Sequence, residues 1–543
     1  MTNKSKVSVG LLMDSFAVPA WVFLMLEKIR DSDHSSISLI VLNEQKHTKS
    51  TNLSDSFLMK IYRKLERLKV GKIPNHLSIK NAENLLGQIP SLKINAAGNK
   101  KQTSLSAEDI QKIKAYNIDV FIQVGFSSIG REFPTTKFGI WALQHGVATA
   151  NGFNFPGFWE VLKGHPFFTS RLVNLRSEND QSEILYTSNS LVNIFSIYQT
   201  ASIACWKSAS FIPRKLKGIA EGKINDVKDV KTEFDNRIYK EPNQIDLVRL
   251  IIDFSFKFIK EKIVNRFIRQ QWTLLYKINN QSGAPENYKI ITPPKNRFWA
   301  DPFILERNNQ YYVFIEESKM GSEKKGYLSY LTFDKQGNHS KPQKIIEQPY
   351  HMSYPFLLEW QNELYMIPES NKDKNIQLYK CKQFPNEWEF QYNLMEDLEA
   401  VDTTLFFHNN LWWMFTNIKE NEGGSLWDEL FLFYADNPLS KNWIPHPQNP
   451  IVSDVTRSRP AGEIFNRDGK IIRPAQNCSF RYGYGLKFLE ITKLSTSEYE
   501  EREISSIEPD WNPSINAVHT FNRAGDFSIM DAVLKRNKFF GRK

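Results

Sequence analysis

Ala300-Asp-Pro-Phe-Ile-Leu305 decides the fold of the second half of the chain, because related stretches recur four more times after it. They are Ser353-Tyr-Pro-Phe-Leu-Leu358, Val401-Asp-Thr-Thr-Leu-Phe406, Ala461-Gly-Glu-Ile-Phe465 and Val518-His-Thr-Phe521. Each is an apolar run of strand length, and a second such run follows, in most cases after a turn signal such as Asn-Asn or Asp-Gly. A β-rich repeat of about 50–60 residues is typical of propeller blades. The sequence therefore predicts an all-β five-bladed β-propeller over residues 272–543.

The first half, residues 1–210, has a different pattern, in which short apolar runs alternate with segments of helical periodicity. The expected strands are Lys6–Leu12, Ile37–Leu42, Ile118–Phe126 and Gly139–Leu143, and the expected helices are Val18–Arg30 and Ala107–Tyr116. Buried strands separated by helices are typical of a parallel sheet that helices cover on both faces. We therefore expect an α/β Rossmann-like domain here.

Residues 211–271 join the two halves and are expected to form a basic linker followed by an amphipathic helix over Leu247–Arg269. One broad face of this helix is apolar, and its members are Leu247, Ile251, Phe254, Phe258 and Val264. The polar face carries an excess of Lys and Arg. Two interpretations stay open: a connecting helix docked on a domain, or a peripheral contact of residues 247–269 with an anionic membrane surface.

The charge balance is mildly basic, with 70 Lys and Arg against 60 Asp and Glu and a net charge of +10. Both signs are interspersed, so nucleic acid is not an expected partner. No His or Cys residues have zinc-ligand spacing, and no metal is predicted. The apolar run near the N-terminus divides into a strand and a helix, which favours a soluble N-terminus over a signal peptide. We expect a cytoplasmic protein, which would lie peripherally at the inner face of the membrane if residues 247–269 contact a membrane surface.

Three motifs of the first half carry a resemblance to a known family. They are Phe138-Gly-Ile-Trp-Ala-Leu-Gln-His-Gly146, Phe155-Pro-Gly-Phe-Trp-Glu-Val161 and Asn179-Asp-Gln-Ser-Glu-Ile184. Their order and spacing resemble the formyltransferase fold of methionyl-tRNA and sugar-amine formyltransferases. The resemblance implies formyl transfer from 10-formyltetrahydrofolate to an amine, with His145 as general base and Asp180 as its partner. It also implies a folate-side loop at Val124, Gly125 and Phe126.

The chain departs from that family at the position that stabilises the oxyanion. Leu143 stands where the family has an Asn, and Ser182 replaces a Gly of the Asp motif. Loss of one oxyanion donor costs on the order of 10²–10³ in rate. Two alternatives follow: a divergent transferase, or a domain that keeps the fold with an inactive site.

The second half resembles the N-terminal domain of glucosamine inositolphosphorylceramide transferases and five-bladed glycoside hydrolases of the arabinanase type. The motifs that carry this resemblance include Phe298-Trp-Ala-Asp-Pro-Phe303, His351-Met-Ser-Tyr-Pro355 and Arg459-Pro-Ala-Gly-Glu463. In the hydrolases the blades bring a base, a modulator and an acid to a central funnel, and the resemblance implies Asp301, Asp402 and Glu463 in these roles. The candidate ligand-binding residues of the funnel are Asp301, His351, Glu369, Asp402, Arg459, Glu463, Arg473 and His519.

Arginines among these residues would pair with the carboxylates or with an anionic sugar or phosphate. Binding without cleavage, hydrolysis and a purely structural role of the carboxylates therefore stay open for the propeller. The hypothesis for the whole chain is a transferase of surface-glycan biosynthesis that acts on an amino sugar, a nucleotide-linked sugar or a lipid-linked glycan. The alternative is a carbohydrate-binding or glycoside-hydrolase-like propeller joined to an inactive formyltransferase-like domain.

Overall fold

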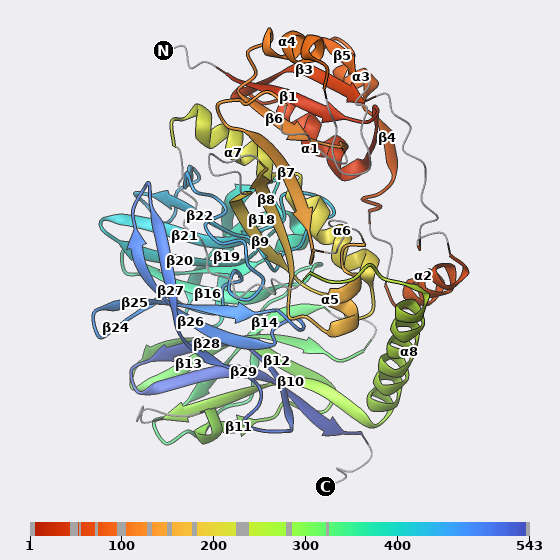
Figure 1. Ribbon diagram of the computed structural model, residues 1–543. Helices are drawn as coiled ribbons and strands as arrows, with labels where there is room; N and C mark the ends of the chain where they lie inside the picture. The colour runs from red at the N-terminus through yellow and green to blue at the C-terminus, as the bar shows by residue number, and fades with distance from the viewer. Residues whose placement is uncertain are drawn as a thin grey trace. The chain divides into compact units, whose positions relative to one another are not determined.

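A computed structural model describes residues 6–43, 53, 56–70, 74–94, 105–126, 133–148, 155–175, 182–223, 238–278, 285–321 and 325–538 (Figure 1). The chain divides into two compact units. The first holds residues 1–254 with 421–424, and the second holds residues 255–420 with 425–543. The boundary falls inside one long helix, so each unit is described by itself.

The first unit is built on a seven-stranded sheet with the order β5-β3-β1-β6-β7-β8-β9. Its strands are β1 (Val7–Met13), β3 (Ser35–Asn43), β5 (Ser91–Ile94), β6 (Val120–Gln123), β7 (Ile140–His145), β8 (Phe168–Asn174) and β9 (Glu183–Ser190). The first five run parallel, as the sequence predicts, whereas β8 and β9 run antiparallel to their neighbours. The sheet is therefore mixed and not wholly parallel.

Helices pack on both faces of this sheet because its central strands are apolar on both sides. Val9 and Leu11 of β1 join a core with α1 (Ala20–Arg30). Leu12 of the same strand joins a second core with Ile113 of α4 (Ala107–Lys114). The expected helix near residue 18 begins after Pro19, a residue that suits the start of a helix because its φ is fixed and it lacks an N–H.

The expected linker from residue 211 is wrong in its first part. Phe211–Ala220 forms α7, which buries Phe211, Ile212 and Leu216 in the first unit. The basic residues between them suggested a polar linker. On a helix, however, Ile212 and Leu216 lie four residues apart and face the core together.

The other elements of the first unit complete its edges. They are β2 (Ala17–Pro19), α2 (Phe57–Lys69), β4 (Ile79–Asn81), α3 (Glu83–Leu86), α5 (Phe158–Lys163) and α6 (Ile197–Ser208). The buried Tyr62 and Glu66 tie α2 to α6, because the Tyr62 hydroxyl accepts the Ile197 N–H and Glu66 accepts the Ser196 hydroxyl at 2.6 Å.

The second unit contains five four-stranded antiparallel sheets within the described residues, which confirms the five-bladed propeller. Four blades are consecutive along the chain. Their strands are β12 (Arg297–Arg307), β13 (Gln310–Lys319), β14 (Gly326–Phe333) and β15 (Gln343–Ile346); β16 (Ser353–Trp360), β17 (Glu363–Glu369), β18 (Asn375–Gln383) and β19 (Glu387–Glu396); β20 (Ala400–His408), β21 (Leu411–Ile418), β22 (Leu430–Ala435) and β23 (Ile444–Pro445); and β24 (Phe465–Arg467), β25 (Lys470–Asn477), β26 (Gly485–Leu494) and β27 (Tyr499–Ile507).

The fifth blade joins the two ends of the propeller segment. Its order is β11-β10-β29-β28, with β10 (Ile268–Ile278) and β11 (Lys289–Ile291) from the start and β28 (Ile515–Ala524) and β29 (Phe527–Asn537) from the end. β10 and β29 pair without interruption from Ile268 opposite Asn537 to Ile278 opposite Phe527. This pairing closes the ring of blades.

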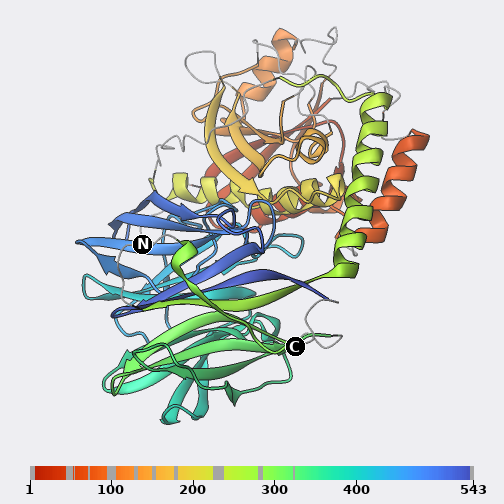
Figure 2. The same cartoon turned by 90° about the horizontal axis from the view of Figure 1, so that it is seen from below.

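The helix α8 (Gln244–Phe267) leads directly into β10, and Figures 1 and 2 show the two as one continuous path. The expected helix over Leu247–Arg269 is therefore confirmed, with its start three residues earlier and its end two residues earlier. Among the described residues, no helix is both long enough and apolar enough to cross a bilayer.

The closing blade should be sensitive to loss of its buried side chains. Leu275 of β10 is 1% exposed and packs against β28 and β29, whereas its cross-strand neighbour Ile290 on β11 is 42% exposed. Leu275→Ala should lower the free energy of unfolding by about 2–5 kcal/mol, because it leaves a cavity. Urea denaturation followed by tryptophan fluorescence would measure this. Ile290→Ala is the matched control, with an expected change within about 0.5 kcal/mol; equal losses in both variants would contradict the assignment of the closing strand.

Candidate functional site

The second residue of each repeat lies where the first strand of a blade is distorted. Asp301, Tyr354 and Asp402 have φ values of 50°, 46° and 53°, and Gly462 has 129°. The pairing register shifts at this point in β12, β16, β20 and β28. A bulge turns a side chain away from the ordinary alternation of a strand, and a non-glycine residue held there costs about 1–3 kcal/mol. Because β12 contacts β16 and β28, and β16 contacts β20, these positions face one another across the propeller.

One group of side chains gathers around Asp301. Its oxygens accept the Tyr354 N–H at 3.2 Å and the Thr520 hydroxyl at 2.8 Å. Asp531 accepts the Asp301 N–H at 2.8 Å and faces Nδ1 of His519 at 2.7 Å. Nε2 of the same imidazole lies 3.6 Å from Asp301. His519 therefore lies between two buried carboxyls.

The protonation states in this group are set by burial and by opposite charge. Burial raises the pKa of Asp301 to about 6, although His519 acts in the other direction. Burial also acts to lower the pKa of His519, but Asp531 and Asp301 outweigh it and raise that pKa above its ordinary value. The geometry therefore favours an imidazolium held between two acids.

A second group is organised by Arg459. Its Nε donates to Asp402, and its other guanidinium nitrogen lies 3.3 Å from Asp402 and 3.4 Å from Glu369. Gln476 also donates to Asp402, at 2.9 Å. Two acids are thus held by one buried guanidinium. Burial raises the pKa of Glu369 well above its usual range, and the Asp402 charge raises it further.

A third pair, Glu316 and His351, lies beside these groups. Nδ1 of His351 accepts the Gly326 N–H at 2.9 Å, so a neutral imidazole carries its proton on Nε2, which faces Glu316 at 3.5 Å. Burial, with smaller contributions from Lys372 and Arg459, lowers the pKa of His351 to about 4. Burial and four neighbouring carboxyls raise the pKa of Glu316 well above its usual range. The pair is therefore neutral, and both members keep hydrogen-bonding capacity.

Two tyrosines connect the groups. Tyr354, fully buried, donates its N–H to Asp301, and its hydroxyl lies 2.8 Å from both the Thr404 hydroxyl and the Gly462 nitrogen. The Tyr482 ring packs edge-on against His519 at 5.3 Å, and the Arg459 guanidinium lies over it at 4.9 Å. The carboxyl-rich centre is therefore one connected network.

Half-exposed aromatic rings border this network. Trp272 stacks on His519 with ring centres 4.1 Å apart, and Trp427 packs against Tyr482 at 5.5 Å. All three aromatic side chains, those of Trp272, Trp427 and Tyr482, keep part of their surface open to solvent. Flat apolar faces beside hydrogen-bonding groups are the combination that binds sugar rings.

The group Asp301, His519 and Asp531 also offers three possible metal-ligand atoms within 4.8 Å of one another. Asp531 already accepts N–H groups on both oxygens, from Asp301 on one and from His519 and Thr520 on the other. Each acidic oxygen is thus satisfied by protein donors. The donor set fits a hydrogen-bonded cluster better than an ion site.

Glu463 stands apart from the network. Its N–H donates to Asn522 at 2.8 Å, and its carboxyl has no hydrogen-bond partner within the described ranges. The side chain is partly exposed, and burial raises its pKa to about 7. It is a carboxyl that can hold or release a proton near neutral pH.

Arg473, another predicted funnel residue, lies elsewhere in the fourth blade. Its guanidinium binds both oxygens of Glu501 on β27, each at 2.9 Å, and also donates to the Arg457 carbonyl. The side chain is 1% exposed and links strands of one blade. Of the predicted set, the structure therefore brings together Asp301, His351, Glu369, Asp402, Arg459 and His519.

In the first unit, His145 lies at the end of β7 and is buried. Its Nδ1 lies 3.0 Å from the Ser170 hydroxyl, and no described residue binds its Nε2. The edge of Trp21 packs on the ring at 5.3 Å. Burial, with a smaller contribution from His76, lowers the pKa of His145 to about 4. The imidazole is therefore neutral at physiological pH and a weak base.

The other predicted residues of the first half give little support to a folate site. Asp180 lies outside the described residues. The Val124 N–H donates to Leu12 in the sheet, Phe126 packs in a core, and a Cβ at Gly125 would meet Asp14 at 3.0 Å. Leu143 packs against the core that contains α1, and it has no donor for an oxyanion. The residues described here do not complete a formyl-transfer site.

The second unit is thus a five-bladed propeller with an acidic, aromatic-bordered centre. Residues 286–528 match the family model described as glucosamine inositolphosphorylceramide transferase 1, N-terminal. A relative of that name from Oryza sativa subsp. japonica is 36% identical over 211 residues, which cover 38% of this chain and 28% of the relative. One from Arabidopsis thaliana is 29% identical over 236 residues, or 41% of this chain and 30% of the relative. The chain spans less than a third of these curated relatives.

Solved propellers also resemble this chain at a low level. A family 117 glycoside hydrolase from Zobellia galactanivorans has a TM-score of 0.32 and 10% identity, and it covers 48% of this chain and 90% of its own. The β-1,2-mannobiose phosphorylase from Listeria innocua has a TM-score of 0.34 and 10% identity over 49% of this chain and 96% of its own. Likeness at this level says nothing about the reaction that this chain performs.

Several residues of the centre do not appear among the sequence predictions. They are Trp272, Glu316, Tyr354, Trp427, Tyr482, Thr520 and Asp531. Tyr354 could have been found, because it occupies the same repeat position as Asp301 and Asp402. Glu316 and Asp531 lie on second strands, where the repeat is less regular. Trp272, Trp427 and Tyr482 lie outside the repeated motif, so no spacing marks them.

The raised pKa of Glu463 predicts a pH-dependent loss of stability. Its folded-state pKa lies above the unfolded value, so its contribution is present below about pH 4.5 and is lost as the pH rises through about 7. Glu463→Gln should match the original protein at pH 4 and exceed it at pH 8 by roughly 1–3 kcal/mol, a range that allows for partial exposure. Urea denaturation at both pH values measures the difference. The exposed Glu387→Gln is the control, and an advantage of Glu463→Gln over the original protein that does not grow from pH 4 to pH 8 would refute the assignment.

Proposed function

We propose that the propeller binds the sugar part of a glycoconjugate that carries an amino sugar, and that the chain acts in glycan transfer to a lipid. The observation that carries this proposal is the connected carboxyl network bordered by Trp272, Trp427 and Tyr482. Sugar rings present apolar faces to aromatic side chains and hydroxyls to acids and amides.

Charge favours an amino sugar as the ligand. Five carboxyls meet in the network, and the cations among the described residues there are Arg459 and His519. Raised pKa values keep Glu316 and Glu369 protonated, so the three Asp carboxyls of the network are the ones that oppose these two cations. An ammonium group would be attracted to this centre by the acids and by the aromatic faces.

The family match also supports an amino sugar as the ligand and a role in glycan transfer. The name of the matched relatives combines glucosamine, a lipid and transfer, and the matched part is less than a third of each relative. For this chain we therefore assign sugar recognition to the propeller and leave the transfer step as a proposal for the whole protein. The proposed partner is a lipid-linked glycan at the inner face of a membrane.

Hydrolysis is a second candidate for the propeller because two of its acids titrate near neutrality. The pKa values of about 6 for Asp301 and about 7 for Glu463 suit a base and an acid. Against this, both oxygens of Asp301 already accept protein hydrogen bonds, and Asp402 is held by Arg459. Carboxyls that are held by protein donors are less available to act as base or acid in hydrolysis, so we rank sugar binding above cleavage.

Formyl transfer in the first unit would rest on His145. A neutral imidazole with an unfilled Nε2 could accept a proton from an amine, but Leu143 supplies no oxyanion donor, so we derive no formyl-transfer step.

Removal of the aromatic border should weaken sugar binding. Trp272→Ala and Tyr482→Ala should each lower affinity for a glucosamine-terminated oligosaccharide about 5- to 30-fold, because each removes stacking surface. Isothermal titration calorimetry on the full chain measures this, with the N-acetylated oligosaccharide as the uncharged comparison. Phe390→Ala, a 47% exposed aromatic on β19, is the control and should bind normally. Equal affinity of all variants, or no preference for the free amine, would refute the proposal.

A direct titration with 10-formyltetrahydrofolate tests the first unit. The geometry around Leu143, Gly125 and Phe126 predicts no saturable binding. Saturable binding that His145→Gln weakens would instead favour formyl transfer, and His165→Gln is the matched control histidine of the same unit. The propeller proposal is unaffected by either result, because its readout is oligosaccharide affinity.

A further inference from the structure

The helix α8 has two apolar faces, and the part of the chain that the structure describes covers only one of them. Of the face predicted from the sequence, Leu247 and Phe254 are buried, while Ile251, Phe258 and Val264 are partly buried; Leu250, outside that predicted set, is buried too. Phe254 packs edge-on against Tyr62 at 6.2 Å and Phe195 at 5.6 Å. This confirms the docked interpretation for the first half of the helix.

The opposite face is apolar too and is exposed. Ile252, Phe256, Ile259 and Ile263 are 62%, 66%, 57% and 55% exposed. At about 3.6 residues per turn, their spacing of three and four residues places them in a single stripe. From Ser255 to the end of α8 no side chain is buried. An apolar stripe of this length on a soluble surface marks a docking face.

Basic residues border the stripe on both sides. Between residues 255 and 267 the sequence has four cations, Lys257, Lys260, Lys262 and Arg266, against one acid, Glu261. Lys260, Lys262 and Arg266 form no ion pair with a described residue, and they are exposed. The charged border therefore has an excess of positive charge available to an anionic partner.

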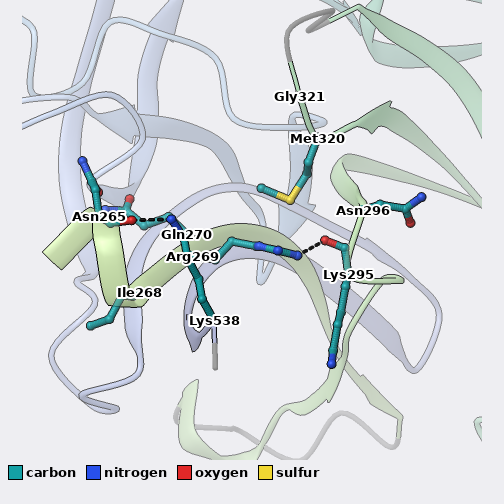
Figure 3. Close-up of a pocket in the computed structure, with 9 residues that line it drawn as sticks. All are labelled: Asn265, Ile268, Arg269, Gln270, Lys295, Asn296, Met320, Gly321 and Lys538. Carbon is teal, nitrogen blue, oxygen red and sulfur yellow. Dashed lines mark hydrogen bonds between the residues drawn. The ribbon is translucent and has the colours of Figure 1, made fainter. Parts of the chain in front are cut away.

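A groove extends this basic surface beyond the end of α8 (Figure 3). It encloses about 510 Å³, and nine residues line it: Asn265, Ile268, Arg269, Gln270, Lys295, Asn296, Met320, Gly321 and Lys538. Three of them are cations, and none is an acid. Arg269 reaches the Lys295 carbonyl, and Lys538 donates to the Asn265 carbonyl at the end of the helix (Figure 3).

We propose that the second half of α8, together with this groove, docks on an anionic lipid bilayer. The apolar stripe enters the boundary between headgroups and acyl chains, while the basic border and the groove contact lipid phosphates. Charge decides between this occupant and a second copy of the chain. In a pair of such helices the basic borders would face each other, and like charges at close range repel.

The test is co-flotation of the full chain with vesicles of phosphatidylcholine alone or mixed with phosphatidylglycerol. The protein should float with the anionic vesicles and not with the neutral ones, and raised salt should release it. The triple variant Phe256→Ser, Ile259→Ser, Ile263→Ser should reduce the bound fraction at least tenfold. The variant Lys260→Gln, Lys262→Gln, Arg266→Gln should weaken binding by about fivefold per removed charge.

The matched control replaces three exposed apolar residues elsewhere on the propeller: Phe390→Ser, Phe407→Ser and Ile504→Ser. It should float like the original protein, and far-UV circular dichroism should match for all variants. Flotation that is equal for the stripe variant and the control would overturn the proposal. So would a dimer in analytical ultracentrifugation that the stripe variant dissociates, in the absence of vesicle binding.

Discussion

The pairing of β10 with β29 is the constraint on which the propeller depends. Strands more than 230 residues apart in the sequence meet in one sheet from Ile268–Asn537 to Ile278–Phe527, and no other described contact joins the ends of the ring so extensively. The same blade positions Trp272 on β10 beside His519 on β28 and brings Asp531 of β29 to both Asp301 and His519. Closure of the ring and assembly of the acidic centre are therefore one event: a chain with an open ring has neither a complete fifth blade nor a complete network.

The acidic centre is stable because its charges are distributed. Arg459 neutralises Asp402 and borders Glu369, and the imidazolium of His519 lies between Asp531 and Asp301. The remaining carboxyls carry protons because burial raises their pKa values. A buried ion pair adds little net stability but is costly to break. The hydrogen-bonding groups of the centre are thus held in fixed positions. Partly exposed aromatic rings border them, and a ligand can reach these rings.

The sequence predicts most of the propeller and the outline of its centre, because both follow from a repeat that spacing reveals. Asp301, Asp402 and His519 share one repeat position, and the bulge there brings them together. Arg473 shows the limit of this reasoning: its motif looks like that of Arg459, but its guanidinium faces Glu501 on β27, and only the strand pairing determines that direction.

Trp272 was not predicted because its role depends on the closing blade. In the first half, the basic residues of Phe211–Ala220 predict a linker, but the spacing of Phe211, Ile212 and Leu216 allows this segment to form a helix with a buried face.

The repeated bulge keeps a similar backbone kink while the side chain at that position varies. The five repeats have Asp, Tyr, Asp, Gly and His at their second residue, and the four positions with positive φ carry three different residue types, Asp, Tyr and Gly. The backbone of a blade therefore does not dictate what it presents at the centre. Duplicated blades that kept this kink could exchange one side chain at a time without loss of the ring. Such a scaffold would let specificity evolve, or be redesigned, as a choice of five residues on a common frame.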